Sequence, residues 1–227
     1  MIERLKVHGQ MSESMMTIAF LTMSGGLQDA YSYCVRGKVF ANAQTGNIVL
    51  MSGHFFDGQW AEGFQYLVPI LFFAFGVFAA EQIRDRYQKI QTVHWRQVIV
   101  LMEIFLLFVV GFFPADMNLM ANSITSFACA MQVQTFRKVN GCAFASTMCI
   151  GNLRSGVEAF SRFLKTKNGK SLLKAQEYFC VIGLFALGAG MGARFAQQFG
   201  YHTIWVCCGL LLVSFILMFI REDLEST

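Results

Sequence analysis

The feature that most constrains this chain is a series of long apolar runs separated by short polar loops. A helix that crosses the hydrocarbon core of a bilayer needs about 20 mainly apolar residues. Six segments meet this requirement: 15–35, 63–80, 97–113, 118–136, 178–195 and 203–220. Hydrophobic residues make up 55% of the 227 residues and charged residues only 14%, too little charge to cover the surface of a soluble domain. We therefore expect an all-α integral membrane protein with a single membrane domain, residues 1–227.

Two further segments, 39–56 and 143–164, are apolar at their ends and polar in the middle, and both contain Gly-Asn. Their small and polar residues are Asn42, Gln44, Thr45, Gly46 and Asn47 in the first segment, and Ser146, Thr147, Gly151 and Asn152 in the second. Non-helical backbone is tolerated at membrane depth only where protein or water surrounds it. Glycine adopts dihedral angles that other residues resist. We expect each segment to be re-entrant or broken, with the break at its glycine.

The chain also repeats itself weakly. A shift of 105 residues places Gly46-Asn47 on Gly151-Asn152 and Asp29 on Gln134. A slightly larger shift then places Tyr66 on Tyr178 and the run 73–76 on 185–188. Internal similarity in a fixed order indicates duplication. We expect one repeat at about 15–113 and a second at about 118–220.

The distribution of lysine and arginine predicts the topology. If both Gly-Asn segments cross the membrane, the basic residues divide almost evenly, eight against nine. If both return to the face they came from, fourteen lie on the side of the N-terminus and three, Arg36, Lys38 and Arg194, on the other side, with Arg154 left out of both counts. The positive-inside rule favours the second arrangement, with both termini cytoplasmic. Each half then has three crossings, so the second half is inverted relative to the first, as in many secondary transporters.

Asp29 is the sharpest candidate for chemistry, because it lies past the middle of the first span. An ionisable side chain there normally faces a cavity or a partner. Asp29 is expected to bind a cation, carry a proton, or pair with Arg154 or Arg36 for structure alone. The predicted substrate-binding residues are Asp29, Gln28, Gln134 and Arg154, together with Asn42, Gln44, Thr45, Gly46, Asn47, Thr147, Gly151 and Asn152. Exposed half-helix ends at the two breaks would hold an ion or polar solute. The alternative is that these small and polar residues only let helices pack closely.

Other chemistry-bearing residues have simpler interpretations. Glu103, about one and a half turns into its span, is expected to reach towards the basic inner loop. The segment 155–174 resembles an amphipathic surface helix. The seven cysteines show no metal-ligand spacing, and no nucleotide-binding or hydrolase motif is present. We therefore expect no enzyme activity, no cofactor, no bound metal and no nucleic-acid partner.

The stretch 25–32, GGLQDAYS, followed by 39–47, VFANAQTGN, resembles the YoaK family of bacterial multi-pass membrane proteins, known mainly as a domain of unknown function. The family pattern is roughly Gly-x-x-Asp-Ala and then a segment that ends in Thr-Gly-Asn. The second half departs from it, with Cys149-Ile150 before Gly151. The resemblance covers nearly the whole chain. It implies a bacterial inner-membrane location and supplies no substrate.

These observations lead to one preferred function and two alternatives. The preferred function is a secondary transporter of an unidentified small solute or ion. A channel of similar build and a non-transporting membrane partner or assembly protein remain open. The expected partners are the lipid bilayer and a small molecule or ion, and an oligomer is compatible with the sequence.

Overall fold

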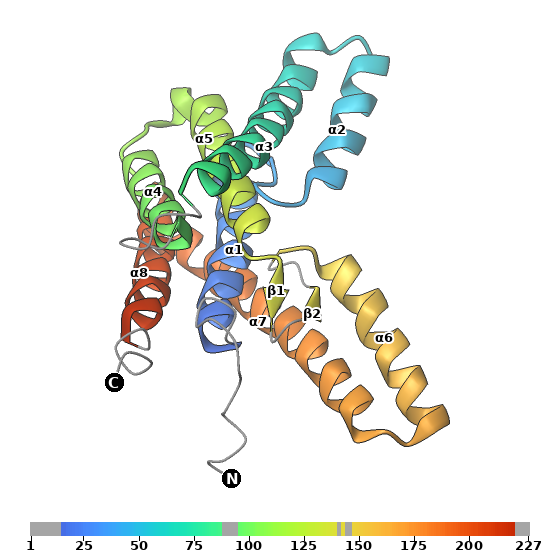
Figure 1. Cartoon of the computed structure of the whole chain (residues 1–227). Helices are drawn as coiled ribbons and strands as arrows, with labels where there is room; N and C mark the ends of the chain where they lie inside the picture. Colours follow the sequence, from blue (N-terminus) through green and yellow to red (C-terminus); the bar gives the residue numbers. More distant parts are fainter. Residues whose placement is uncertain (1–14, 88–94, 140–141, 144–146, 221–227) are drawn as a thin grey trace.

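The computed structural model describes residues 15–87, 95–139, 142–143 and 147–220, and most of them are helical (Figure 1). The helices are α1 Met15–Val35, α2 Gln44–Phe56, α3 Trp60–Tyr87, α4 Trp95–Val110, α5 Asn118–Thr135, α6 Cys149–Thr166, α7 Gly169–Phe199 and α8 Ile204–Ile220. Two 3-10 turns, η3 Ala115–Met117 and η4 Gly200–Thr203, precede α5 and α8. A short antiparallel pair, β1 Lys138–Val139 and β2 Cys142–Ala143, lies between α5 and α6 and is an addition to the predicted all-α fold.

Each predicted span lies on a helix. The first span and α1 have the same bounds, and the spans 63–80 and 178–195 lie within the longer helices α3 and α7. Helix α4 ends at Val110, three residues before the predicted end of its span, because Gly111 begins a turn that leads into Pro114. Glycine and proline are both poor continuations of a helix.

By length and composition alone, two helical stretches of the described residues are apolar enough to cross a membrane. They are Trp60–Tyr87 and Gly169–Met218, and the second covers α7, η4 and most of α8. The helix of α4 has only 16 residues, which is short for this criterion. Helices α1 and α5 are richer in small and polar residues, many of them buried, among them Thr17, Ser24, Gln28, Ser126 and Gln132. Such helices suit positions where other helices, rather than lipid, surround them.

The helices pack in a pattern that is the same for the two halves of the chain. Helix α1 packs on α7 and α8, and α5 packs on α3 and α4. Helices α2 and α3 form one hairpin and α6 and α7 another. Figure 1 shows the tips of these hairpins at opposite ends of the molecule. The first helix of each half therefore packs against the third and fourth helices of the other half.

Two glycines, one in each half, make close contacts of this kind with a neighbouring backbone. A Cβ atom on Gly76 of α3 would overlap the carbonyl oxygen of Phe127 on α5. A Cβ atom on Gly188 of α7 would overlap the carbonyl oxygen of Met23 on α1. The sequence alignment of the two halves places Gly76 on Gly188, and Met23 and Phe127 are separated by 104 residues, close to the shift of 105. Aligned glycines thus make equivalent contacts.

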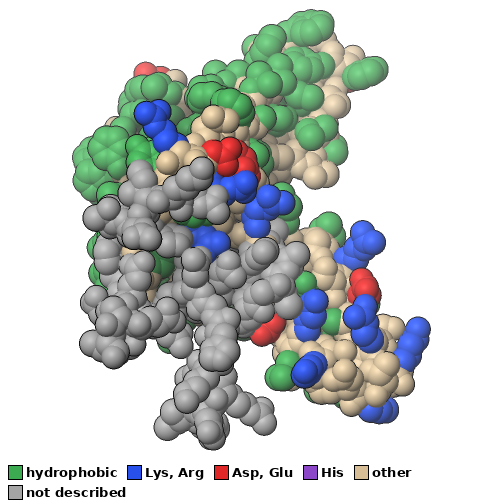
Figure 2. Space-filling view, in the orientation of Figure 1, with side chains coloured by type: hydrophobic (Ala, Val, Ile, Leu, Met, Phe, Trp, Pro, Cys, Tyr) green, Lys and Arg blue, Asp and Glu red, His purple; other side chains and the backbone are tan. Residues whose placement is uncertain are grey.

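The main hydrophobic core lies between α1, α4, α5 and α8, around Leu21, Leu107, Ala128 and Leu211. The outer surface is also apolar in large part. Figure 2 shows hydrophobic side chains covering the α2–α3 hairpin, where Phe56, Trp60, Phe64 and Phe75 are exposed. The tip of the α6–α7 hairpin is polar and carries a group of basic side chains: Arg162, Lys165, Lys167, Lys170 and Lys174. An apolar outer surface of this kind is suited to contact with lipid.

Candidate functional site

Both Gly-Asn segments are interrupted, but the interruption precedes the glycine. Gly46 and Asn47 are the third and fourth residues of α2, and Gly151 and Asn152 are the third and fourth residues of α6. The described glycines with positive φ are Gly37, Gly58 and Gly200, so neither predicted break point uses the freedom of glycine. The prediction of breaks at Gly46 and Gly151 is therefore wrong. Gly46 instead makes room for a ring, since a Cβ atom there would lie 3.1 Å from Phe40.

The first interruption is the non-helical segment 36–43, whose backbone is held by side chains. Asn47 replaces a backbone partner for Phe40: its Oδ1 accepts from the Phe40 N–H at 2.9 Å, and its Nδ2 donates to the Phe40 carbonyl at 2.7 Å. The Ala41 N–H donates to Oγ of Ser32 at 3.1 Å, and Nε2 of Gln44 donates to the Ala41 carbonyl at 2.8 Å. Buried backbone groups need partners. These polar residues supply them where no helix can.

Asp29 faces the same segment. Its Oδ1 accepts a hydrogen bond of 2.6 Å from the N–H of Asn42, and the residue is only 7% exposed. Asn42 lies just before α2, whose N-cap, Ala43, makes no side-chain capping bond, so the carboxylate sits near the positive end of the α2 dipole. Within the described residues, Asp29 forms no ion pair with Arg36 or Arg154, so the predicted structural pairing is wrong.

Arg36 is fully buried at the end of α1. It donates to the hydroxyl of Tyr31 at 2.7 Å, the carbonyls of Val110 at 3.0 Å and Pro114 at 3.2 Å, and Oδ1 of Asn118 at 3.1 Å. Its guanidinium carbon also lies 4.2 Å from the centre of the Tyr201 ring. Arg36 therefore fastens α1 to α4, α5 and η4 and is not a free loop charge. One of the three basic residues that oppose the predicted topology is thereby accounted for.

The second interrupted segment meets the first at α1. The side chain of Thr147 occupies the space beside Gly25, where a Cβ atom would overlap it. Nδ2 of Asn42 donates to the Gly25 carbonyl at 3.2 Å. Thr147 and Asn42 therefore both contact Gly25. Within the described residues, the buried Oδ1 of Asn42 has no hydrogen-bond partner. Ser146 lies outside the described residues, and Asn152 is 3% exposed.

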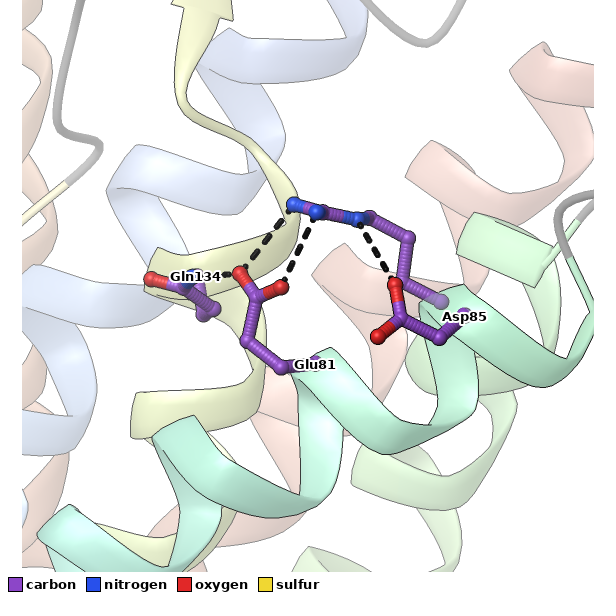
Figure 3. Close-up of polar contacts among 4 residues, drawn as sticks. Glu81, Asp85 and Gln134 are labelled. Atoms are coloured by element: carbon purple, nitrogen blue, oxygen red, sulfur yellow. Dashed lines mark hydrogen bonds and ion pairs between the residues drawn. The ribbon is translucent and has the colours of Figure 1, made fainter.

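Four predicted residues lie away from this group. Thr45, Gly151 and Arg154 are exposed on α2 and α6. Gln134 of α5 instead donates to Glu81 of α3, which also pairs with Arg84 at 3.1 Å (Figure 3). Figure 3 shows this polar cluster, with Asp85 beside it, on the α3–α5 contact. The predicted correspondence of Gln134 with Asp29 is therefore one of sequence position, not of contacts.

Gln28, the residue before Asp29 on α1, points into the helical core. Its Nε2 donates to Oγ of Ser24 at 3.0 Å and to Oε1 of Glu103 on α4 at 3.1 Å. Its Oε1 accepts from the thiol of Cys129 on α5 at 2.6 Å. Glu103 is fully buried, so the expectation that it reaches towards the inner loop is wrong. In the sequence, Glu103 is recognisable as a lone acid within an apolar run. Its partner, Gln28, lies 75 residues earlier in the chain and cannot be recognised from the local sequence.

Comparison with known proteins assigns the chain to a family. A family model described as "Protein of unknown function (DUF1275)" matches residues 17–217. The chain belongs to this family. It is also similar to the UPF0700 transmembrane protein YoaK of Bacillus subtilis (strain 168), with 26% identity over 221 residues that cover 92% of this chain and 95% of that protein. No solved structure matches.

The resemblance to the YoaK family is thus confirmed, and the chain is a membrane protein of a family without an assigned function.

Proposed function

We propose that this protein is a secondary transporter of a small solute or ion, with its binding site where the interrupted segments meet Asp29. The observation that carries the proposal is that α2 and α6 each have a buried asparagine in the first turn, Asn47 and Asn152, and follow described non-helical residues, 36–43 and 147–148. Both N-caps, Ala43 and Met148, lack a side-chain capping bond. Helix ends of this kind at membrane depth provide partial charges and backbone groups for a ligand.

The proposed architecture is six transmembrane helices, α1, α3, α4, α5, α7 and α8, in two inverted halves of a bacterial inner-membrane protein with cytoplasmic termini. The equivalent contacts of Gly76 and Gly188 and the opposite hairpin tips support it. Helix α2 has 13 residues, about 20 Å at 1.5 Å per residue, which is shorter than a hydrocarbon core of about 30 Å. Helix α6 carries Arg154, Arg162 and Lys165, which oppose a full crossing.

Asp29 is the residue assigned to ligand binding. It is a buried carboxylate in the described part of the chain with a backbone donor and no ion-pair partner there. A carboxylate without a compensating cation is costly at membrane depth, and a transported cation or a proton would remove that cost. Asn42, with its unpartnered Oδ1, and Thr147 complete the group.

The test is a flux assay on proteoliposomes with radiolabelled sodium, rubidium, chloride, small organic acids and small amines. Asp29→Asn retains the oxygen that accepts from Asn42 and removes the charge. We expect uptake of the transported probe to fall about tenfold or more, equivalent to about 1.4 kcal/mol. The matched control is Asp57→Asn, an exposed acid at the end of α2, which should transport normally. Equal uptake by wild type and Asp29→Asn for every probe would contradict the proposal, and ohmic current would indicate a channel instead.

One observation favours a second candidate, a non-transporting membrane partner protein. Gln44 and Asn47 use their side chains to satisfy the backbone of segment 36–43, as a purely structural loop clamp would. In that case every probe would give no flux above empty liposomes. A specific membrane protein would then co-purify with the wild type in stoichiometric amount.

A further inference from the structure

A second acidic group lies in the core, where it contacts Gln28, the residue before Asp29 on α1. Glu103 of α4 has no exposed surface. Its Oε1 accepts from Nε2 of Gln28 at 3.1 Å, and its Oε2 is buried without a hydrogen-bond partner among the described residues. No ion pair joins Glu103 to a basic residue in the described part of the chain. The group is therefore half satisfied and electrically uncompensated.

The surroundings of Glu103 offer little to an ionised carboxylate. The titratable groups that face it are thiols, Cys129 on α5 and Cys207 and Cys208 on α8. On α1, Gln28 is neutral, and the next residue, Asp29, is acidic and, like Glu103, acts on Cys129. Leaving a charge buried without a partner costs several kcal/mol. A neutral carboxylic acid avoids that cost, and its O–H supplies the donor that the ionised form lacks.

A bound metal ion is a poorer fit than a proton. Among the described residues, no group of three or more His, Cys, Asp or Glu side chains is arranged to hold a metal. Gln28 already uses its Oε1 to accept from the Cys129 thiol and its Nε2 to donate to Ser24 and Glu103. Hard cations require several oxygen ligands. Among the described residues around Glu103, the buried carboxyl oxygen without a hydrogen-bond partner is its own Oε2, and one oxygen suffices for a proton.

We propose that Glu103 and Gln28 form an intramembrane proton-binding site, distinct from the Asp29 group, and that the proton is the coupling ion of this protein. The coupling role rests on the proposed transport function, whereas the proton site does not. Protonation of Glu103 places the proton on Oε2, and Gln28 holds Oε1 in both states. Because Gln28 and Asp29 are neighbours on α1, movement of that one helix would act on both acidic groups.

The experiment is infrared difference spectroscopy of the full chain in lipid nanodiscs over a reversible pH titration. We expect a carbonyl band of a buried carboxylic acid that loses intensity as pH rises, that is absent from Glu103→Gln and that persists in Asp29→Asn. The Glu103→Gln variant retains an oxygen for Gln28 and is nearly isosteric. A second variant, Gln28→Ala, removes the donor to Oε1, so the same band should move to higher frequency because its carbonyl becomes free.

Three results would overturn the proposal. The band is unchanged in Glu103→Gln, or it does not respond to pH while the protein remains folded, or it is displaced by sodium at constant pH. None of these measurements requires transport. If the band titrates as expected while no probe gives flux, the proton site stands and the proposed transport function fails.

Discussion

At the scale of single residues, the polar side chains of the family motif serve the backbone before they serve a ligand. Asn47 pairs with both the N–H and the carbonyl of Phe40, as a neighbouring strand would. Asp29 likewise accepts a hydrogen bond from the backbone N–H of Asn42. A non-helical segment that lies inside a membrane protein must find internal partners for its backbone. The motif supplies these partners from residues adjacent in sequence, which explains its compact spacing.

The fully buried Asn47 should therefore be essential for stability. Asn47→Ala removes the partners of the part-buried Phe40 N–H and carbonyl, and two such unsatisfied groups cost up to about 2–4 kcal/mol. We expect a clearly lower melting temperature for the purified protein in detergent. The control is Gly53→Ala on the same helix, where an added Cβ atom meets nothing within 4 Å. Equal melting temperatures for Asn47→Ala and the wild type would show that the Phe40 bonds do not hold the segment.

Residue-scale prediction from the sequence succeeded where neighbours in the chain are also neighbours in space. Asp29, Asn42, Gln44 and Asn47 were placed together correctly, because the segment between them folds back on its own helix. Glu103 was misassigned because its partner is remote in sequence. A lone acid near the end of a span has the same local pattern whether it reaches for water or points into the core. The sequence contains no signal that separates the two.

At the scale of elements, the helices approach most closely where a glycine of one helix lies against the backbone of another. Gly188 and Gly192 of α7 lie against Met23 and Leu27 of α1, whereas Gly183 and Gly190 on the same helix face open space. Small residues allow backbones to approach in this way. The glycine series of α7 is thus divided between contact positions and positions without contacts.

This division predicts opposite effects from the same substitution. Gly188→Ala places a methyl group on the Met23 carbonyl and should destabilise the protein by about 1–3 kcal/mol through overpacking. Gly183→Ala and Gly190→Ala should be neutral or stabilise α7 by up to about 1 kcal/mol, since alanine is the better helix former. Melting temperatures of the three variants in one detergent provide the comparison. If Gly188→Ala melts no lower than the two controls, the α1–α7 contact is looser than the structure has it.

The helices themselves were predictable from hydropathy, and the interruptions were not. Apolar length located α1, α3, α4, α5, α7 and α8, and α1 to the residue. The breaks were assigned to Gly46 and Gly151 because glycine is the usual signal for one. In the structure the break precedes Gly46, where Gly37 and Lys38 have positive φ values of 87° and 65°. Gly46 is helical because its requirement is space for Phe40, and that requirement depends on tertiary contact.

At the scale of the whole molecule, the two halves share a contact pattern while their hairpins differ in surface. The α2–α3 hairpin is apolar along its exposed side, and the α6–α7 hairpin ends in a cluster of lysines and arginines (Figure 2). The two halves of the chain thus have the same packing pattern, and their hairpins differ in the charge of their exposed surfaces. If the halves are inverted as proposed, the positive-inside rule accounts for basic residues at one tip and not at the other.

The topology can be tested by cysteine labelling at exposed positions with ordinary backbone geometry. Gly37 and Gly58 are unsuitable, because their positive φ would strain a cysteine. Asp57 after α2, Asp116 in η3 and Lys170 at the start of α7 are exposed and free of this strain. The parent chain should lack the exposed Cys34 and Cys180, and labelling of the remaining cysteines is subtracted.

The two candidate topologies give different outcomes in this assay. If α2 and α6 return to the face they came from, Asp57→Cys and Asp116→Cys react with an impermeant maleimide on intact cells, and Lys170→Cys reacts only after permeabilisation. If both helices cross, two crossings separate each labelled position from the next. All three positions then lie on one side of the membrane, and the reagent labels them alike. A 13-residue α2 is too short to cross alone, so we expect the first outcome. Uniform labelling would contradict the inverted arrangement of the two halves. It would also contradict the proposal that the two interrupted segments meet beside Asp29 to form a binding site.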